Sequence, residues 1–285
     1  METFKYSDLL GRLEGFDAWL THLGLTPCPN DRIHQAIQFL HRAEEASRKG
    51  RETGVYSNIR PGDWFPVIEA LEAHDVFLAF QDDPSPAIGA ALKRALSGPL
   101  HPIHENVKNR DGRNIWFELA LAAEWRLRGV SLDLGEPDLQ LKMGGVTFLV
   151  ACKRPASERS IDGNLRDAIG QLRRNLDTAP PGTFGVTAIS LSCIFNPGDK
   201  VFSGEMNTLN ALLESVFARR EQYLLSVNDP RICCVLLHVA TPSLGIDVDL
   251  LRASHNLAWD LDRPSIGSKI FREHALKMRN RRKKR

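Results

Sequence analysis

Two residues suited to act together on a charged substrate, Asp138 and Lys153, lie on either side of a glycine pair. Gly144-Gly145 predicts a two-residue hairpin turn, because such turns need positive φ angles that glycine adopts without steric cost. In that register Asp138 lies opposite Ala151, and Lys153 is on the same face two residues further on. A carboxylate and an ammonium group placed in this way could hold a divalent ion and phosphate oxygens.

The reverse face of the predicted hairpin, residues 138–152, is apolar throughout. The alternation of strand side chains puts seven apolar residues there. They are Leu139, Leu141, Met143, Val146, Phe148, Val150 and Cys152. The pattern therefore predicts one face in the core and one face available for chemistry.

These residues resemble the active-site hairpin of PD-(D/E)XK nucleases, in which a first strand beginning with Asp, often after Pro, precedes a second strand ending in Asp or Glu, any residue, then Lys. Pro137-Asp138 matches the first part and Lys153 the last, whereas Ala151 stands where the second carboxylate belongs. The family commonly has a Glu on the preceding helix, which Glu118 in RNIWFELALAA matches. Some branches have a Gln on the following helix, which Gln171 in AIGQLRRNL matches. The resemblance covers about residues 110 to 195.

The resemblance implies a metal-dependent DNA endonuclease that hydrolyses phosphodiester bonds. Asp138, a carboxylate at position 151 and the carbonyl oxygen of Cys152 would coordinate Mg²⁺ or Mn²⁺, with Glu118 bound to the ion directly or through water. Lys153 would orient the attacking water and offset charge on the scissile phosphate.

Gln171 would orient the substrate or Lys153. Each of these residues also has a purely structural interpretation: Glu118 as a solvated helix residue, Asp138 as turn chemistry, Lys153 as a strand-end partner of Glu136, and Gln171 as a helix-surface residue.

Ala151 cannot bind metal through its side chain, and three accounts of it stay open. An original Glu or Asp was replaced to trap an uncleaved complex and leave a catalytically disabled nuclease. Alternatively, the ligand has moved to Glu136, Glu158 or Asp162. The third account is a natural, non-catalytic pseudo-nuclease that acts as a DNA-binding or assembly subunit.

The order of elements predicts an α/β fold with a restriction endonuclease-like mixed β-sheet flanked by helices, preceded by a mainly helical region. Helical spacing at 9–20 and 33–43, with short helices at about 66–79 and 85–97, assigns residues 1–105 to that helical region. A helix capped by Asn114 opens a nuclease-like domain at 106–276. That domain continues with a helix at about 160–176, a strand at 184–195, a helix near 207–225 and a strand at 232–240.

The net charge of +2 is unevenly distributed. Lys and Arg number 10 against 15 Asp and Glu in residues 1–105, and 27 against 20 in residues 106–285. The C-terminal segment 277–285 is predicted to be a disordered tail that anchors a phosphate backbone. Its seven basic residues are Lys277, Arg279, Arg281, Arg282, Lys283, Lys284 and Arg285.

Composition indicates a globular protein, and we expect it in the cytoplasm. No apolar run is long enough for a membrane span, the N-terminus is charged unlike a signal peptide, and the five cysteines form no CxxC pair. The expected partner is DNA. Nucleases of this family often work in antiviral (antiphage) defence beside a helicase or ATPase subunit, which the acidic helical region could dock. No Walker motif occurs in the chain, so an ATP-driven step would belong to such a partner.

Overall fold

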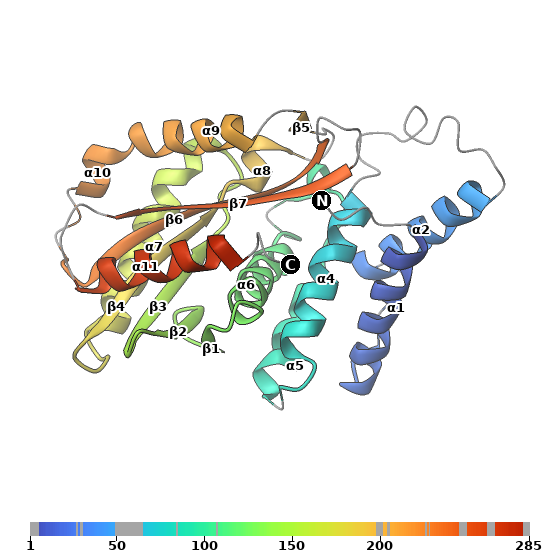
Figure 1. The fold of residues 1–285 in the computed structure, drawn as a ribbon, viewed down its shortest axis with the longest axis horizontal. Coiled ribbons are helices and arrows are strands. Elements are labelled where there is room, and N and C mark those ends of the chain that lie inside the picture. The colour runs from blue at the N-terminus through green and yellow to red at the C-terminus, as the bar shows by residue number, and fades with distance from the viewer. Residues whose placement is uncertain are drawn as a thin grey trace. The chain divides into compact units, whose positions relative to one another are not determined.

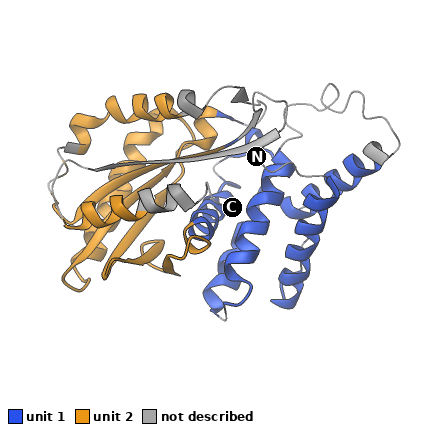
Figure 2. Cartoon of the chain, in the orientation of Figure 1, with its two compact units in different colours: residues 1–124, 196–204, 241–253 blue, residues 125–195, 205–240, 254–285 orange. Residues whose placement is uncertain are grey.

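The computed structural model describes residues 6–26, 28, 31–48, 65–83, 85–106, 108–197, 202–203, 206–225, 227, 229–244, 250–260 and 266–281 (Figure 1). The chain forms two compact units, which Figure 2 distinguishes by colour. The first comprises Met1–Glu124, Asn196–Gly204 and Thr241–Ala253, and the second Trp125–Phe195, Glu205–Ala240 and Ser254–Arg285. The helix that contains Glu118 thus groups mainly with the N-terminal helices, whereas the sequence placed it with the nuclease-like domain.

The first unit is built mainly from helices. They are α1 (Tyr6–His22), α2 (Arg32–Arg48), α4 (Phe65–Phe80), α5 (Pro86–Ala95), the 3₁₀ turn η3 (Pro102–His104) and α6 (Asp111–Arg126). Helices α1, α2 and α4 pack against one another, and α4 is buried on almost every side. The predicted helical region is therefore confirmed for the described residues.

Helix α6 begins at Asp111, three residues before the predicted cap, Asn114. Gly112 lies inside this first turn, although glycine disfavours a helix interior. In the structure, a Cβ at Gly112 would collide with the backbone and hydroxyl of Ser97. Glycine therefore lets the start of α6 lie close to Ser97, a contact that the helical pattern alone does not reveal. The prediction of Asn114 as the N-cap was wrong.

A buried ionic network joins α2, α4 and α6. The guanidinium of Arg32, fully buried, lies 3.5 Å from Glu69 and 5.1 Å from the ring centre of Trp116. Arg113 lies 3.1 Å from Glu69, and the indole of Trp116 donates to Glu72 at 2.7 Å. Because Arg32 and Arg113 both lie beside Glu69, and Glu72 accepts a hydrogen bond from Trp116, the network links the three helices through buried polar contacts.

The strands form a mixed sheet. Their bounds are β1 (Ser131–Leu134), β2 (Leu139–Met143), β3 (Val146–Lys153), β4 (Thr183–Ser190), β5 (Phe202–Ser203), β6 (Ile232–Leu244) and β7 (Leu250–Asp260). The order is β1-β2-β3-β4-β6-β5, and β7 also pairs with β6. The pairs β1–β2 and β2–β3 are antiparallel, whereas β3–β4 and β4–β6 are parallel. This confirms an α/β fold with a mixed sheet.

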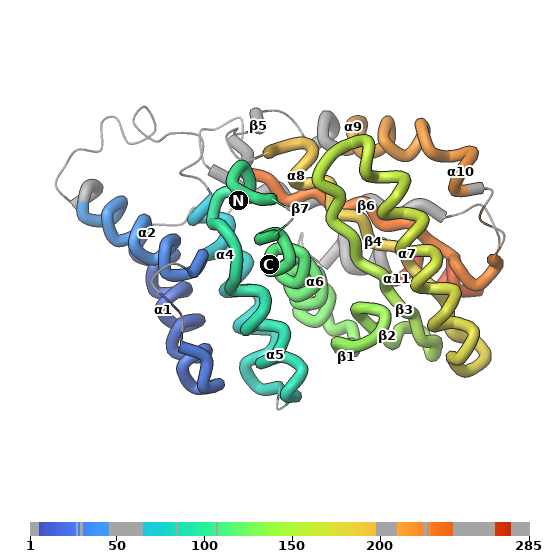
Figure 3. Tube along the Cα trace, turned by 180° about the vertical axis from the view of Figure 1, so that it is seen from behind, coloured from blue at the N-terminus to red at the C-terminus, as the bar shows by residue number. Residues whose placement is uncertain are grey.

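Helices cover both faces of this sheet. The helices that follow the hairpin are η4 (Glu158–Ser160), α7 (Ile161–Leu176), α8 (Ser192–Phe195), α9 (Met206–Ala218), α10 (Glu221–Leu225) and α11 (Ile266–Arg281). Figure 1 shows α11 in front of the sheet, and the reverse view in Figure 3 shows α7 in front of it. On the α11 face, the ring of Phe271 lies 5.5 Å from that of Phe148.

Close packing of α7 depends on Gly185 of β4. A Cβ at Gly185 would lie 3.2 Å from Leu176 and 3.3 Å from Leu172, so glycine lets the helix approach the strand. Helix α7 therefore lies over the face that carries Gly185 and, two residues on, Thr187.

Two further predictions differ from the structure. The predicted strand 184–195 ends at Ser190, and α8 follows it. Residues 277–281 continue helix α11 and are not the start of a separate tail.

Candidate active site

The hairpin has the predicted register. Leu139 pairs with Val150, Leu141 with Phe148, and Met143 with Val146. Gly144 and Gly145 have φ angles of 57° and 80°, as the turn requires. Asp138 immediately precedes β2, so continuing the register places it opposite Ala151.

The hairpin face expected for chemistry is buried in the middle of β3. Leu149 and Ala151 are as inaccessible as the apolar residues of the reverse face. The reason is α7, which covers this face of β3 and β4. Some access to solvent remains for the other residues of this face, which are Asp138, Gln140, Lys142, Thr147 and Lys153.

Asp138 is held by the opposite strand. Its Oδ2 accepts a hydrogen bond of 2.6 Å from the backbone amide of Cys152. Burial raises the pKa of Asp138 above its usual value, and the Cys152 amide and the nearby Lys153 ammonium oppose that rise. The charge of Glu136 adds to the rise. Asp138 is thus oriented and partly desolvated.

Lys153 projects from the carboxyl end of β3 into a polar contact with α7. Its Nζ donates to Gln171 Oε1 at 2.7 Å and lies 3.9 Å from Asp138 Oδ2. The Lys153 side chain is 24% exposed and that of Asp138 is 16% exposed. The ammonium therefore has two oxygen partners within the protein and retains access to a ligand in solvent.

Gln171 connects all parts of this cluster. Its Oε1 accepts from Lys153, and its Nε2 donates to the carbonyl oxygen of Pro137 at 3.0 Å. Both ends of the carboxamide are satisfied, which fixes its orientation. Three of the residues singled out from the sequence, Asp138, Lys153 and Gln171, thus come together.

Ala151 leaves this cluster without a second carboxylate. Its side chain is completely buried and is in register with Thr187 of β4 on the face covered by α7. The Thr187 Oγ1 atom is itself buried and has no hydrogen-bond partner among the described residues. Sequence reasoning did not single out Thr187, although a hydroxyl in the otherwise apolar run GVTAI was a visible signal.

The carboxylates considered as displaced ligands have other positions. Glu158 pairs with Arg219 at 2.9 Å, and Asp162 pairs with Arg220 at 2.7 Å. Glu136 is exposed and influences Asp138 through its charge. None of the three takes part in the amide hydrogen bond or the lysine ion pair of Asp138.

The residues present do not fit a resident divalent ion. In the part of the chain that the structure describes, no group of three His, Cys, Asp or Glu side chains could hold a metal ion. One carboxylate, already accepting an amide hydrogen bond and facing a lysine, is a poor ligand set for Mg²⁺ or Mn²⁺. Cys152 contributes its amide to Asp138.

The remaining predicted residues are not among these contacts. Glu118 is half-buried in the middle of α6, which belongs mainly to the first unit. Lys277, Arg279 and Arg281 lie in the last turns of α11, where the backbone alone is described. Arg282, Lys283, Lys284 and Arg285 lie outside the described residues.

Comparison with known proteins adds no family assignment. No protein-family model matches the chain, and no curated protein is significantly similar to it. Among the described helices, none is long and apolar enough to cross a membrane.

Proposed function

We propose that this chain is a PD-(D/E)XK-type DNA endonuclease in catalytically disabled form, which binds the DNA backbone without hydrolysing it. The observation that supports this most is the contact of Lys153 with both Gln171 and Asp138 at the end of the hairpin. The sequence pattern of that family anticipates these three residue types in this order.

The cluster has the chemistry to hold a phosphate group. The Lys153 ammonium has three donors, of which Gln171 takes one, and it is partly accessible. A phosphate oxygen could therefore accept a charge-assisted hydrogen bond from it. Gln171 keeps the ammonium near the hairpin end, and Asp138 offsets the desolvation of its charge.

The absence of hydrolysis follows from Ala151. With one carboxylate at the site, a metal ion has too few protein ligands to be fixed beside the phosphate. What Lys153 and Gln171 then provide is binding and orientation of the backbone. Mg²⁺ or Mn²⁺ would be the cofactor only of a form with a carboxylate at position 151.

A second candidate function is a natural, non-catalytic pseudo-nuclease. It would use the same fold as a DNA-binding or assembly subunit. The complete burial of Ala151 favours it, because a larger acidic side chain there would need α7 or β4 to adjust. The two candidates differ in whether a carboxylate at position 151 produces cleavage.

DNA binding is tested by fluorescence anisotropy with a labelled duplex in EDTA, comparing the chain with its Lys153→Ala variant. The matched control is Lys142→Ala, which removes an exposed lysine of the same hairpin that pairs with Asp133 at 3.7 Å. Loss of a phosphate contact should lower the slope of log affinity against log salt by about 0.9 for Lys153→Ala. No change is expected for the control.

Failure of the unaltered chain to bind duplex or single-stranded DNA at low salt would overturn the disabled nuclease and leave only the assembly-subunit form of the second candidate. Equal slopes for Lys153→Ala and Lys142→Ala would remove the hairpin end from the DNA-binding surface.

A further inference from the structure

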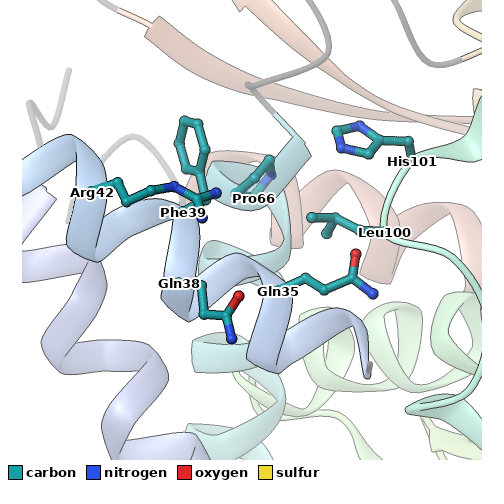
Figure 4. Close-up of a pocket in the computed structure, with 7 residues that line it drawn as sticks. All are labelled: Gln35, Gln38, Phe39, Arg42, Pro66, Leu100 and His101. Atoms are coloured by element: carbon teal, nitrogen blue, oxygen red, sulfur yellow. The ribbon is translucent and has the colours of Figure 1, made fainter. Parts of the chain in front are cut away.

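The helical unit contains a hollow that the proposed function does not use. It lies between α2, the start of α4 and the segment that precedes η3, and its volume is about 270 Å³ (Figure 4). Pro66, Leu100 and the ring of Phe39 supply its apolar lining. Ligand sites for small molecules commonly combine such a lining with a few polar groups.

The polar groups around this hollow are a cation and hydrogen-bonding side chains. Gln35, Gln38 and Arg42 come from successive turns of α2, and His101 lies on the facing segment. Among the residues that the structure describes, no acidic side chain lines it. Arg42 is exposed and makes no ion pair with the described residues. The hollow therefore favours an anion over a cation.

The aromatic groups favour a flat ligand. In the view of Figure 4 Pro66 stands between the rings of Phe39 and His101, and Arg42 lines the same hollow as Phe39. The His101 ring is held edge-on to Phe65, with 6.2 Å between ring centres. Aromatic rings and a guanidinium are the groups on which nucleic-acid bases stack.

We propose that this hollow binds a nucleoside monophosphate unit. The base lies over Pro66 and Leu100 and is flanked by Phe39 and His101, while the carboxamides of Gln35 and Gln38 bond its edge. The phosphate lies against Arg42. The volume of the hollow, about 270 Å³, is at the small end of the range for ligand sites, which suits a single nucleotide unit.

The same chemistry is offered by a free nucleotide and by one nucleotide of a DNA strand. Isothermal titration calorimetry of the full chain with AMP, GMP, CMP and TMP measures the binding of free nucleotides. Binding of a nucleotide within a DNA strand is measured by titrating a short single-stranded oligodeoxynucleotide into the Lys153→Ala protein. The Lys153→Ala substitution removes the contribution of the hairpin end.

Arg42→Ala should weaken binding by roughly tenfold or more, because a hydrogen bond to a charged group contributes about 1.5 to 3 kcal/mol. Lys93→Ala, which removes an exposed cation from α5 of the same unit, is the control and should leave binding unchanged. Adenosine and inorganic phosphate should each bind far more weakly than AMP, because each lacks half of the recognised groups.

Gln38→Leu keeps the volume and apolar contacts and should change the preference among the four bases. The inference is overturned if neither a mononucleotide nor the oligonucleotide binds, or if Arg42→Ala and Lys93→Ala bind equally well. Because the mononucleotide titrations require no activity of the hairpin, they are independent of the proposed nuclease-type function.

Discussion

The Lys153 ammonium donates a 2.7 Å hydrogen bond to Gln171 Oε1, across the gap between the end of β3 and the middle of α7. The other end of the same carboxamide donates to the carbonyl oxygen of Pro137. Gln171 therefore fastens both strands of the hairpin to the helix that covers them. The two hydrogen bonds give Gln171 a structural role in holding the hairpin end, and its predicted role in orienting the substrate or Lys153 stays a prediction.

Gln171→Ala should destabilise the protein and weaken DNA binding together. The substitution leaves the Pro137 carbonyl and the part-buried Lys153 ammonium without these partners, at a cost of about 1 to 3 kcal/mol. Urea denaturation followed by circular dichroism measures the free energy of unfolding. Asp167→Ala, an exposed position on the same helix, should change it by less than about 0.5 kcal/mol. A Gln171→Ala protein as stable as that control would contradict the role given to Gln171.

The free energy of unfolding should depend on pH through Asp138. Burial raises the pKa of this carboxyl, so the folded state holds its proton more tightly than the unfolded state. That contribution is complete below the unfolded pKa, about 3.9, and is lost as pH rises through the higher folded pKa. Asp138→Asn cannot ionise, so its stability relative to the unaltered protein should increase over this range and then level off. Unfolding curves at several pH values check this, and a constant difference would rule it out.

The hairpin could be predicted because its information is local. Gly144-Gly145 determines the turn, and the alternation from Leu139 to Val150 determines which face enters the core. Together they give the pairing register and hence the position of Asp138 opposite Ala151. The helix that became α7 was likewise visible in its apolar spacing.

The contacts made across elements could not be predicted in this way. That α7 lies on the Ala151 face depends on the parallel pairing of β3 with β4 and on the close approach at Gly185. These are relations between distant segments. The buried pair of Arg32 and Glu69 was also invisible, because charged residues in an amphipathic helix are normally expected on its solvated side.

Glu69→Ala should be strongly destabilising. It leaves the fully buried Arg32, and one side of Arg113, without their acidic partner, and breaking a buried ion pair in this way costs about 3 to 5 kcal/mol. Arg94→Ala is the matched control, because the Arg94–Asp111 pair is exposed and contributes less than about 1 kcal/mol. Both values come from urea unfolding curves. Similar losses for the two variants would mean that the buried network contributes little to stability.

Removing residues 277–285 should weaken DNA binding chiefly at low salt. The segment carries seven basic residues, and each phosphate contact that is lost reduces the salt slope by about 0.9. A chain of full length with these seven residues replaced by Gln separates charge from length and should behave like the deletion. Anisotropy titrations at several salt concentrations give the slopes. An unchanged slope in both proteins would exclude this segment from the DNA-binding surface.

Ala151→Glu should convert DNA binding into magnesium-dependent cleavage. The new carboxylate would lie opposite Asp138 and beside Thr187, whose buried hydroxyl lacks a partner among the described residues and could donate to it. Two carboxylates at the hairpin end form a ligand set that suits Mg²⁺. Because position 151 is completely buried, the substitution should also lower the free energy of unfolding, by about 1 to 3 kcal/mol.

The assay is conversion of supercoiled plasmid to nicked or linear DNA with Mg²⁺ or Mn²⁺, against an EDTA control. Adding Lys153→Ala to Ala151→Glu should abolish cleavage, whereas adding Lys142→Ala should not, because Lys142 lies on an exposed part of the hairpin. Folding of each variant is checked by its unfolding curve, so that an inactive protein can be told from an unfolded one. A folded Ala151→Glu protein that binds DNA and Mg²⁺ but never cuts would favour the DNA-binding or assembly subunit over the disabled nuclease, since the site would then lack more than one carboxylate.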